Sequence, residues 1–134
     1  MNKLKAKITH IETSEQISLV DLEVKDDSFS CLVIETPETA PYLEVGKQVF
    51  ILFKETEVSI GKNLSGGISL RNRIKSIIKV IEKGNVLTKI ILNYKGIEIA
   101  SIITTRSANS LDLKEGDEVV GLIKANEVSI LEME

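Results

Sequence analysis

The sequence has little of the residue types on which most catalytic and metal sites depend. Its 134 residues include no tryptophan, one cysteine and one histidine. The single cysteine, Cys31, excludes an intrachain disulfide, and its place in the apolar run 31–34 predicts a buried core position. No cysteine and histidine have the spacing of zinc ligands, and no Walker-type glycine loop is present. His10 has no partner for general-base work, so we expect neither an enzyme nor a metal centre.

Long apolar runs and basic clusters are also missing. No stretch is long enough to cross a bilayer, and residues 1–7 are too charged for a signal peptide, so we expect a cytoplasmic protein. The net charge is −3, and all three arginines, Arg71, Arg73 and Arg106, lie in the second half. A nucleic-acid-binding barrel needs a basic face with stacking rings, whereas only 4% of these residues are aromatic. Nucleic acid and membrane are therefore not expected as partners.

What the sequence does contain is an internal repeat with an offset of 70 residues. The segment Leu-Glu-Val-Gly-Lys-Gln-Val at 43–49 returns as Leu-Lys-Glu-Gly-Asp-Glu-Val at 113–119, and Glu-Val-Ser-Ile at 57–60 returns unchanged at 127–130. Such a repeat predicts one small module in two copies. Residues shared by both copies are expected to serve the fold, and polar residues found in one copy only are candidates for function.

Each copy shows the same order of short apolar segments. In the second copy the predicted strands are 71–81, 86–94, 97–104, 118–124 and 128–131, with one or two helical turns at 107–111 and a hairpin turn at 93–96. Gly96 supplies the positive φ for that turn. In the first copy the segment 36–41 holds two prolines, which should shorten or alter the helix. The pattern predicts an all-β chain of two tandem OB-like five-stranded barrels, each with a short helix before strand 4.

The predicted domain organisation follows from the repeat. Residues 1–61 form a first module and 68–134 a second, and the glycine-containing segment 62–67 is the linker. A module of about sixty residues lies near the lower limit for an independent core. We therefore expect the modules to pack on each other or on another chain.

One group of polar residues marks the second copy. Ser69 and Arg71 open the module, Thr104 and Ser107 flank the turn from strand to helix, and Lys124 follows the fourth strand. These residues supply hydrogen-bond donors and two cations, a set that suits a small dianion. The alternative is that the arginine and lysine are surface charges and that the two hydroxyls cap the helix.

The first copy lacks most of this group. Met1, Ile34 and Pro37 stand where the arginine, threonine and serine stand in the second copy, and only the lysine survives, as Lys54. Glu55 adds a negative charge at the next position. We therefore expect a degenerate site in the first module, where this carboxylate would repel an anion.

The second copy resembles the molbindin family, whose modules are also called Mop or TOBE. The motifs that carry the resemblance are Ile-Ser-Leu-Arg-Asn at 68–72, Tyr-Lys-Gly at 94–96, Ile-Thr at 103–104, Leu-Lys-Glu-Gly-Asp-Glu-Val at 113–119 and Leu-Ile-Lys-Ala at 122–125. Together they cover nearly all of residues 68–131. The first copy resembles the family more weakly, mainly through 43–60, and the whole chain is similar to the tandem form.

The resemblance implies a binding function. Family members bind molybdate or tungstate as intact oxyanions at interfaces between modules, without an organic cofactor and without metal–ligand bonds. The implied oxyanion ligands are Ser69, Arg71, Lys124 and the backbone of Ala125 from one module, and Thr104 and Ser107 from its neighbour. The resemblance also implies strand exchange between modules and a homo-oligomer, either a dimer or a trimer.

The expected function is therefore a cytoplasmic molybdate/tungstate-binding protein for storage, buffering or delivery. The alternative is an oxyanion sensor or regulatory module that acts through a partner protein, because modules of this family also occur attached to DNA-binding domains and transporter ATPases. This sequence contains neither a helix-turn-helix nor a Walker loop, so a sensor would need a separate partner. An OB-type nucleic-acid binder is disfavoured by the scarcity of aromatic residues.

Overall fold

The structure is a computed structural model that describes residues 1–133. These residues form ten β-strands, one α-helix and two short 3-10 helices. In chain order the elements are β1 (Asn2–Ser14), β2 (Ile17–Val24), β3 (Asp27–Val33), β4 (Gln48–Phe53), η1 (Glu55–Glu57), β5 (Ser59–Gly61), β6 (Asn72–Lys83), β7 (Leu87–Tyr94), β8 (Ile97–Thr104), α1 (Thr105–Ser110), β9 (Glu118–Ile123), η2 (Ala125–Glu127) and β10 (Ser129–Glu132). No helix in this part of the chain is long and apolar enough to cross a membrane.

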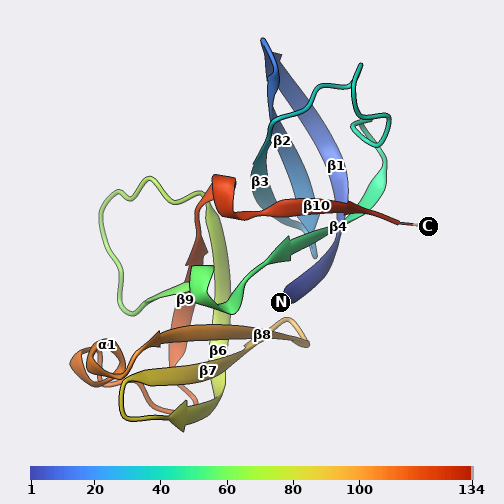
Figure 1. The fold of residues 1–134 in the computed structure, drawn as a ribbon. Coiled ribbons are helices and arrows are strands. Elements are labelled where there is room, and N and C mark those ends of the chain that lie inside the picture. Colours follow the sequence, from blue (N-terminus) through green and yellow to red (C-terminus); the bar gives the residue numbers. More distant parts are fainter. Residues whose placement is uncertain (134) are drawn as a thin grey trace. The chain divides into compact units, whose positions relative to one another are not determined.

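The chain divides into two compact units, each built around one five-stranded sheet (Figure 1). The first-copy unit contains Lys3–Phe53 and the described residues from Lys124 onward, and its strand order is β10-β4-β1-β2-β3. The second-copy unit contains Met1–Asn2 and Lys54–Ile123, and its strand order is β5-β9-β6-β7-β8. The predicted modules 1–61 and 68–134 are continuous segments of the sequence, whereas each compact unit contains residues from both segments. The division of the sequence at the 62–67 linker stays a prediction.

The two copies exchange their last strands. β10 pairs antiparallel with β4 in the first-copy unit, and β5 pairs antiparallel with β9 in the second-copy unit. The exchanged endings also contact the opposite edge of each sheet, since η2 and β10 contact β3 while η1 and β5 contact β8. Each sheet therefore curls into a barrel, and the strand exchange implied by the family resemblance is confirmed.

A matching contact holds each exchanged ending in place. The Cys31 thiol donates to the carbonyl of Val128 at 2.8 Å, and the Ser101 hydroxyl donates to the carbonyl of Val58 at 2.7 Å. The two donors occupy equivalent positions in the repeat, as do the two valines, which are both buried. Burial raises the pKa of the Cys31 thiol to about 12, so this cysteine is un-ionised. The predicted core position of Cys31 is confirmed.

Alternation along the strands explains the barrels. In β6 the residues from Asn72 to Lys79 are buried and exposed in turn, as expected when successive side chains point to opposite faces. β1 repeats the pattern from Asn2 to Ile8. The cores consist mainly of isoleucine, leucine and valine, with Phe29, Phe53 and Tyr94 as the largest fully buried side chains.

Both copies bend their first long strand at the same place. The register shifts after Ile78 in β6 and after Ile8 in β1. The Ile78 N–H donates to the carbonyl of Asp117 at 2.9 Å, and its carbonyl accepts from the Gly116 N–H at 2.8 Å; Ile8 makes the equivalent pair of bonds to the Gly46 turn at the same distances. The two glycines have φ of +91° and +92°, which explains why both copies keep glycine there.

The hairpin turns are also equivalent, with different residues. Lys95 and Gly96 both have positive φ, of 48° and 89°, as a type I′ turn requires, so the prediction for Gly96 is confirmed. In the first copy Lys25 and Asp26 take φ of 51° and 70°. A side chain there is held in the left-handed region at some energetic cost.

The copies differ in the connection before the fourth strand. The second copy forms α1, which starts two residues earlier than the predicted 107–111. In the first copy the described residues 34–47 form turns and no helix. Pro37 and Pro41 lie in this segment, and neither has an N–H for a helical hydrogen bond. The prediction of a short helix in each barrel is therefore right for the second copy and wrong for the first.

Candidate functional site

Four of the six predicted ligand residues lie in the second-copy unit. They are Ser69, Arg71, Thr104 and Ser107, and the other two, Lys124 and Ala125, belong to the first-copy unit. Within the second-copy unit the four form two local groups, one on the segment before β6 and one at the start of α1. Each group has its own hydrogen bonds.

The first group is the pair Thr104 and Ser107 at the start of α1. The Thr104 Oγ1 accepts from the Ser107 N–H at 3.1 Å and donates to the Ser107 Oγ at 2.8 Å. Both residues are exposed. The capping interpretation raised from the sequence is therefore confirmed for the threonine. Because the serine oxygen receives the threonine proton, its own proton can be donated to a ligand.

The second group is the exposed segment that carries Ser69 and Arg71. Sequence reasoning missed the residue that holds it, Arg73 in β6. The Arg73 Nε donates to the carbonyl of Leu70 and its Nη2 to the carbonyl of Ile68, both at 3.2 Å. The segment is thus tied to β6 by one guanidinium.

Lys124 and Ala125 mark the end of β9 and the start of η2. Lys124 is exposed and precedes the helix, and its carbonyl accepts from the Glu127 N–H at 2.9 Å. Ala125 is the first residue of η2, where an N–H has no partner within the helix. The N–H of Ala125 is therefore not used within this helix.

The position equivalent to Ala125 carries a negative charge in the first copy. Glu55 replaces the alanine, and its carboxylate forms an ion pair with the amino group of Met1, the residue equivalent to Arg71. The hydrogen bond from this amino group lowers the pKa of Glu55 below its usual value. A carboxylate therefore already stands beside the cation at this position; that it repels a bound anion stays a prediction.

A hollow of about 440 Å³ adjoins Ser107 on the surface of the second-copy unit. It is lined by Ser59, Ile60, Ile103, Arg106, Ser107, Ser110 and Leu111. No role was predicted from the sequence for Arg106, Ser110 or Ser59. A usable signal was present for the first two, because threonine and alanine stand at their first-copy positions. Ser59 reaches the hollow through the strand exchange.

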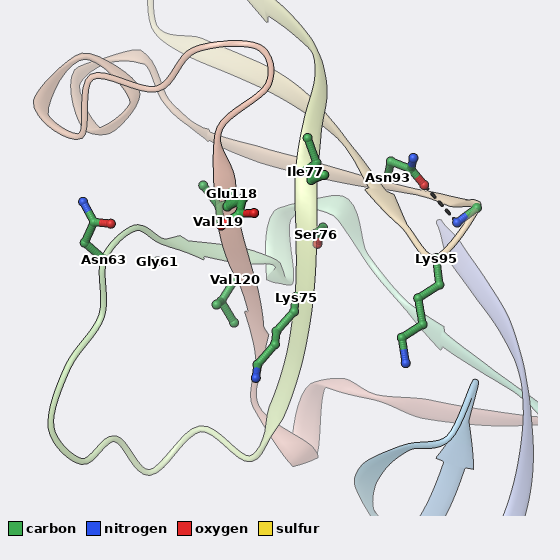
Figure 2. Close-up of a pocket in the computed structure, with 11 residues that line it drawn as sticks. Gly61, Asn63, Lys75, Ser76, Ile77, Asn93, Lys95, Glu118, Val119 and Val120 are labelled. Carbon is green, nitrogen blue, oxygen red and sulfur yellow. Dashed lines mark hydrogen bonds between the residues drawn. The ribbon is translucent and has the colours of Figure 1, made fainter.

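A second hollow of about 560 Å³ lies elsewhere on the same unit, over β6 and β9 (Figure 2). In Figure 2 the side chains of Lys75 and Lys95 extend to the same side, and the Asn93 Oδ1 accepts from the Gly96 N–H at 2.9 Å. Glu118 also lines this hollow, and none of the six predicted ligand residues does. It is therefore separate from the predicted site.

The structure offers no alternative metal centre in the residues it describes. Among them no three histidine, cysteine, aspartate or glutamate side chains are grouped to hold a metal ion. The polar groups of the candidate site are donors, apart from the hydroxyl oxygens and backbone carbonyls. Such a set is suited to an anion held by hydrogen bonds and not by metal–ligand bonds.

Comparison with known proteins places these features in a family. The model of the TOBE domain matches residues 68–130. Molybdenum-pterin-binding protein 3 of Clostridium pasteurianum is 37% identical over 65 residues, which are 48% of this chain and 96% of that protein. The molybdenum import ATP-binding protein ModC of Brucella abortus (strain 2308) is 34% identical over 70 residues, 52% of this chain, but the chain spans only 20% of the length of ModC.

A solved structure covers both copies. The cytoplasmic molybdate-binding protein ModG, crystallised with molybdate bound, superposes with a TM-score of 0.92 and is 27% identical, over 98% of this chain and 96% of that one. The prediction of two tandem OB-like barrels is therefore confirmed. The short family proteins match one copy, and ModG matches two. The chain belongs to the molbindin (Mop/TOBE) family, as a tandem member with two modules.

Proposed function

We propose that this protein binds molybdate, and tungstate with it, as an intact oxyanion through Ser69, Arg71, Thr104, Ser107, Lys124 and the backbone of Ala125. The observation that carries the proposal is that a donor set stands in the second copy and is replaced in the first by Met1, Ile34, Pro37 and Glu55. Relatives named for molybdenum or molybdate match the second copy or the whole chain, which supports the choice of ligand. The protein is a binding protein, not an enzyme.

The chemistry of the ligand agrees with the donor set. Molybdate is a dianion without a proton at neutral pH, and each of its oxygens accepts hydrogen bonds. A protonated phosphate would place a donor against donors and leave a polar group unpaired. Sulfate carries the same charge as molybdate and is smaller. Cavity size is therefore the property that must separate the two.

We propose that the complete site forms between two molecules of the protein. Leu87 lies opposite Thr104 in the β7–β8 ladder and is 55% exposed, and its neighbour Val86 is 74% exposed. A hydroxyl pair rimmed by exposed apolar side chains suits an interface that excludes water. In this arrangement Thr104 and Ser107 of one protein molecule face the Ser69, Arg71 and Lys124 groups of another molecule. The protein is then a homo-oligomer, a dimer or a trimer.

The biological role that fits is storage, buffering or delivery of the oxyanion in the cytoplasm. ModG, which matches the chain along nearly its whole length, is a cytoplasmic molybdate-binding protein. A sensing role would require a partner whose binding depends on molybdate. A pull-down with and without molybdate separates the two roles.

Isothermal titration calorimetry with molybdate, tungstate and sulfate tests the binding function. We expect heat from the first two and none from sulfate, with light scattering reporting an oligomer. Arg71→Met, which installs the first-copy residue, should weaken molybdate binding roughly 100-fold, because the dianion loses a charged hydrogen-bond partner in an interface that excludes water. Lys75→Met removes the same charge from the exposed face of β6 and should leave affinity unchanged. A folded oligomer that releases no heat with molybdate or tungstate refutes the function.

A further inference from the structure

Arg73 holds the segment that carries two of the proposed ligands. The segment 62–71 between β5 and β6 is irregular. The Arg73 side chain donates to two of its carbonyls, those of Ile68 and Leu70, at 3.2 Å each. The carbonyl of residue 68 belongs to the peptide unit that leads into Ser69, and the carbonyl of residue 70 to the unit that leads into Arg71. Each bond therefore fixes the peptide plane immediately before a ligand residue.

The two bonds depend on the shape of the guanidinium. Its donors are arranged in a rigid planar fork, so one side chain can satisfy two carbonyls two residues apart. A lysine ammonium keeps the charge but not the fork. The contact therefore requires arginine and not merely a cation at this position.

The repeat gives an internal comparison for this position. The first-copy counterpart of Arg73 is Lys3, whose Nζ lies 4.1 Å from the centre of the Phe50 ring in the first-copy unit. Val120 replaces that ring in the second copy. The same outward position on the first long strand thus holds an aromatic ring in one copy and the 68–70 backbone in the other. The basic residue at this position therefore packs on a ring in the first copy and binds the segment of Ser69 and Arg71 in the second.

We propose that Arg73 is a positioning residue for the oxyanion site, which orders Ser69 and Arg71 before the ligand arrives and does not itself touch the ligand. This inference rests on the proposed function. An irregular segment that must be ordered on binding reduces affinity by the entropy it loses. Because the Arg73 bonds order the segment when the protein folds, this entropy is not lost again on binding. The free protein therefore already presents both ligand residues.

The test combines amide hydrogen exchange of the free protein with molybdate calorimetry on Arg73→Lys, Arg73→Ala and the control Lys75→Ala. Both Arg73 variants should speed exchange in residues 68–71 and weaken molybdate binding, each roughly tenfold, while the control changes neither. Circular dichroism should show that all three variants keep the fold, because these side chains are exposed.

Two results would overturn the proposal. If Arg73→Lys keeps wild-type affinity while Arg73→Ala loses it, Arg73 acts through its charge and not through its two hydrogen bonds to the segment. Unchanged exchange at 68–71 in both variants would show that the segment is ordered by other contacts. If the wild type binds no molybdate, the proposed function fails. The exchange data then show separately whether Arg73 orders residues 68–71.

Discussion

The first-copy unit and the second-copy unit share a frame, and one connection differs between them in secondary structure. Both bend their first strand at an isoleucine that is bonded to a glycine turn, and both hold the exchanged ending through a donor on the third strand. They diverge between the third and fourth strands, where the second copy has Thr104, Ser107 and α1 and the first has Ile34, Pro37 and turns. The shared residues therefore maintain the barrel, while two of the proposed ligand residues, Thr104 and Ser107, lie on a connection that the barrel does not constrain.

The largest expected effect tests the shared frame. Ile8→Ala and Ile78→Ala each remove a fully buried side chain at the same bend of the first strand. Each should lower the free energy of unfolding by about 3 kcal/mol, from lost burial and an unfilled cavity. Urea denaturation of both variants gives the values. A cost below about 1 kcal/mol in only one copy would show that the two bends are not equivalent.

The next prediction tests the difference at the connection. Thr104→Val keeps the shape of the side chain and removes the cap of α1, so stability should fall by about 1 kcal/mol. Under the proposed function, molybdate affinity should also fall roughly tenfold with the hydroxyl. Thermal unfolding and calorimetry measure the two effects.

The first copy supplies the control for this variant. Ile34→Thr places the same hydroxyl at the equivalent position, but Pro37 has no N–H to donate to it. This variant should therefore gain neither a helix nor stability. A stabilisation like that of a helix cap would contradict the account of why α1 is missing in the first copy.

A smaller effect is expected at the hairpin turns. Asp26 has φ of +70°, in the region where its counterpart Gly96 has +89°. Asp26→Gly should raise stability by about 0.5 kcal/mol, because relief of backbone strain exceeds the added entropy of the unfolded chain. Gly96→Asp should have the opposite sign. Chemical denaturation of the two variants measures both changes in stability. Two changes of the same sign would refute the role of backbone strain at these positions.

The smallest expected effect is a difference in acid sensitivity. The Lys114 N–H and then the Lys62 ammonium hold the pKa of Asp117 below its ordinary value of 3.8. A lowered pKa in the folded state gives stability that is present above the ordinary pKa and is lost as the pH falls through the folded value. The first copy has Lys47 at this position and lacks the effect.

Urea unfolding between pH 3 and 7 checks this prediction. Asp117→Asn should flatten the acid side of the stability curve relative to the wild type. Lys62→Met, which removes the second donor and leaves the first, should give an intermediate curve. Parallel curves for the wild type and Asp117→Asn would show that this carboxylate contributes nothing to acid unfolding.

Much of the fold followed from local patterns in the sequence. β8 occupies the predicted residues 97–104, and the strand of residues 118–124 ends one residue early, because alternating apolar residues and flanking turns mark both. Strand exchange was different, since Val58 and Val128 lie in identical Glu-Val-Ser-Ile endings and alternation alone cannot say which sheet either ending joins. Only the family resemblance implied it.

The candidate site was predictable in part for a similar reason. Thr104 and Ser107 stood out because the repeat lacks them in the first copy, and their spacing of three residues matches a helix cap. Arg73 did not stand out, because its counterpart Lys3 is also basic. Its role depends on the fork of the guanidinium and on a carbonyl five residues earlier, which no periodicity reveals.

The exchanged endings have a consequence for assembly. Val58-Ser59-Ile60 and Val128-Ser129-Ile130 are the same tripeptide, so these residues do not distinguish one barrel from the other. The next position does, because Leu131 stands where the other ending has Gly61, and a side chain at Gly61 would collide with the side chain of Leu64. The two endings are therefore not interchangeable, and the size of one residue sets which ending the second-copy unit accepts.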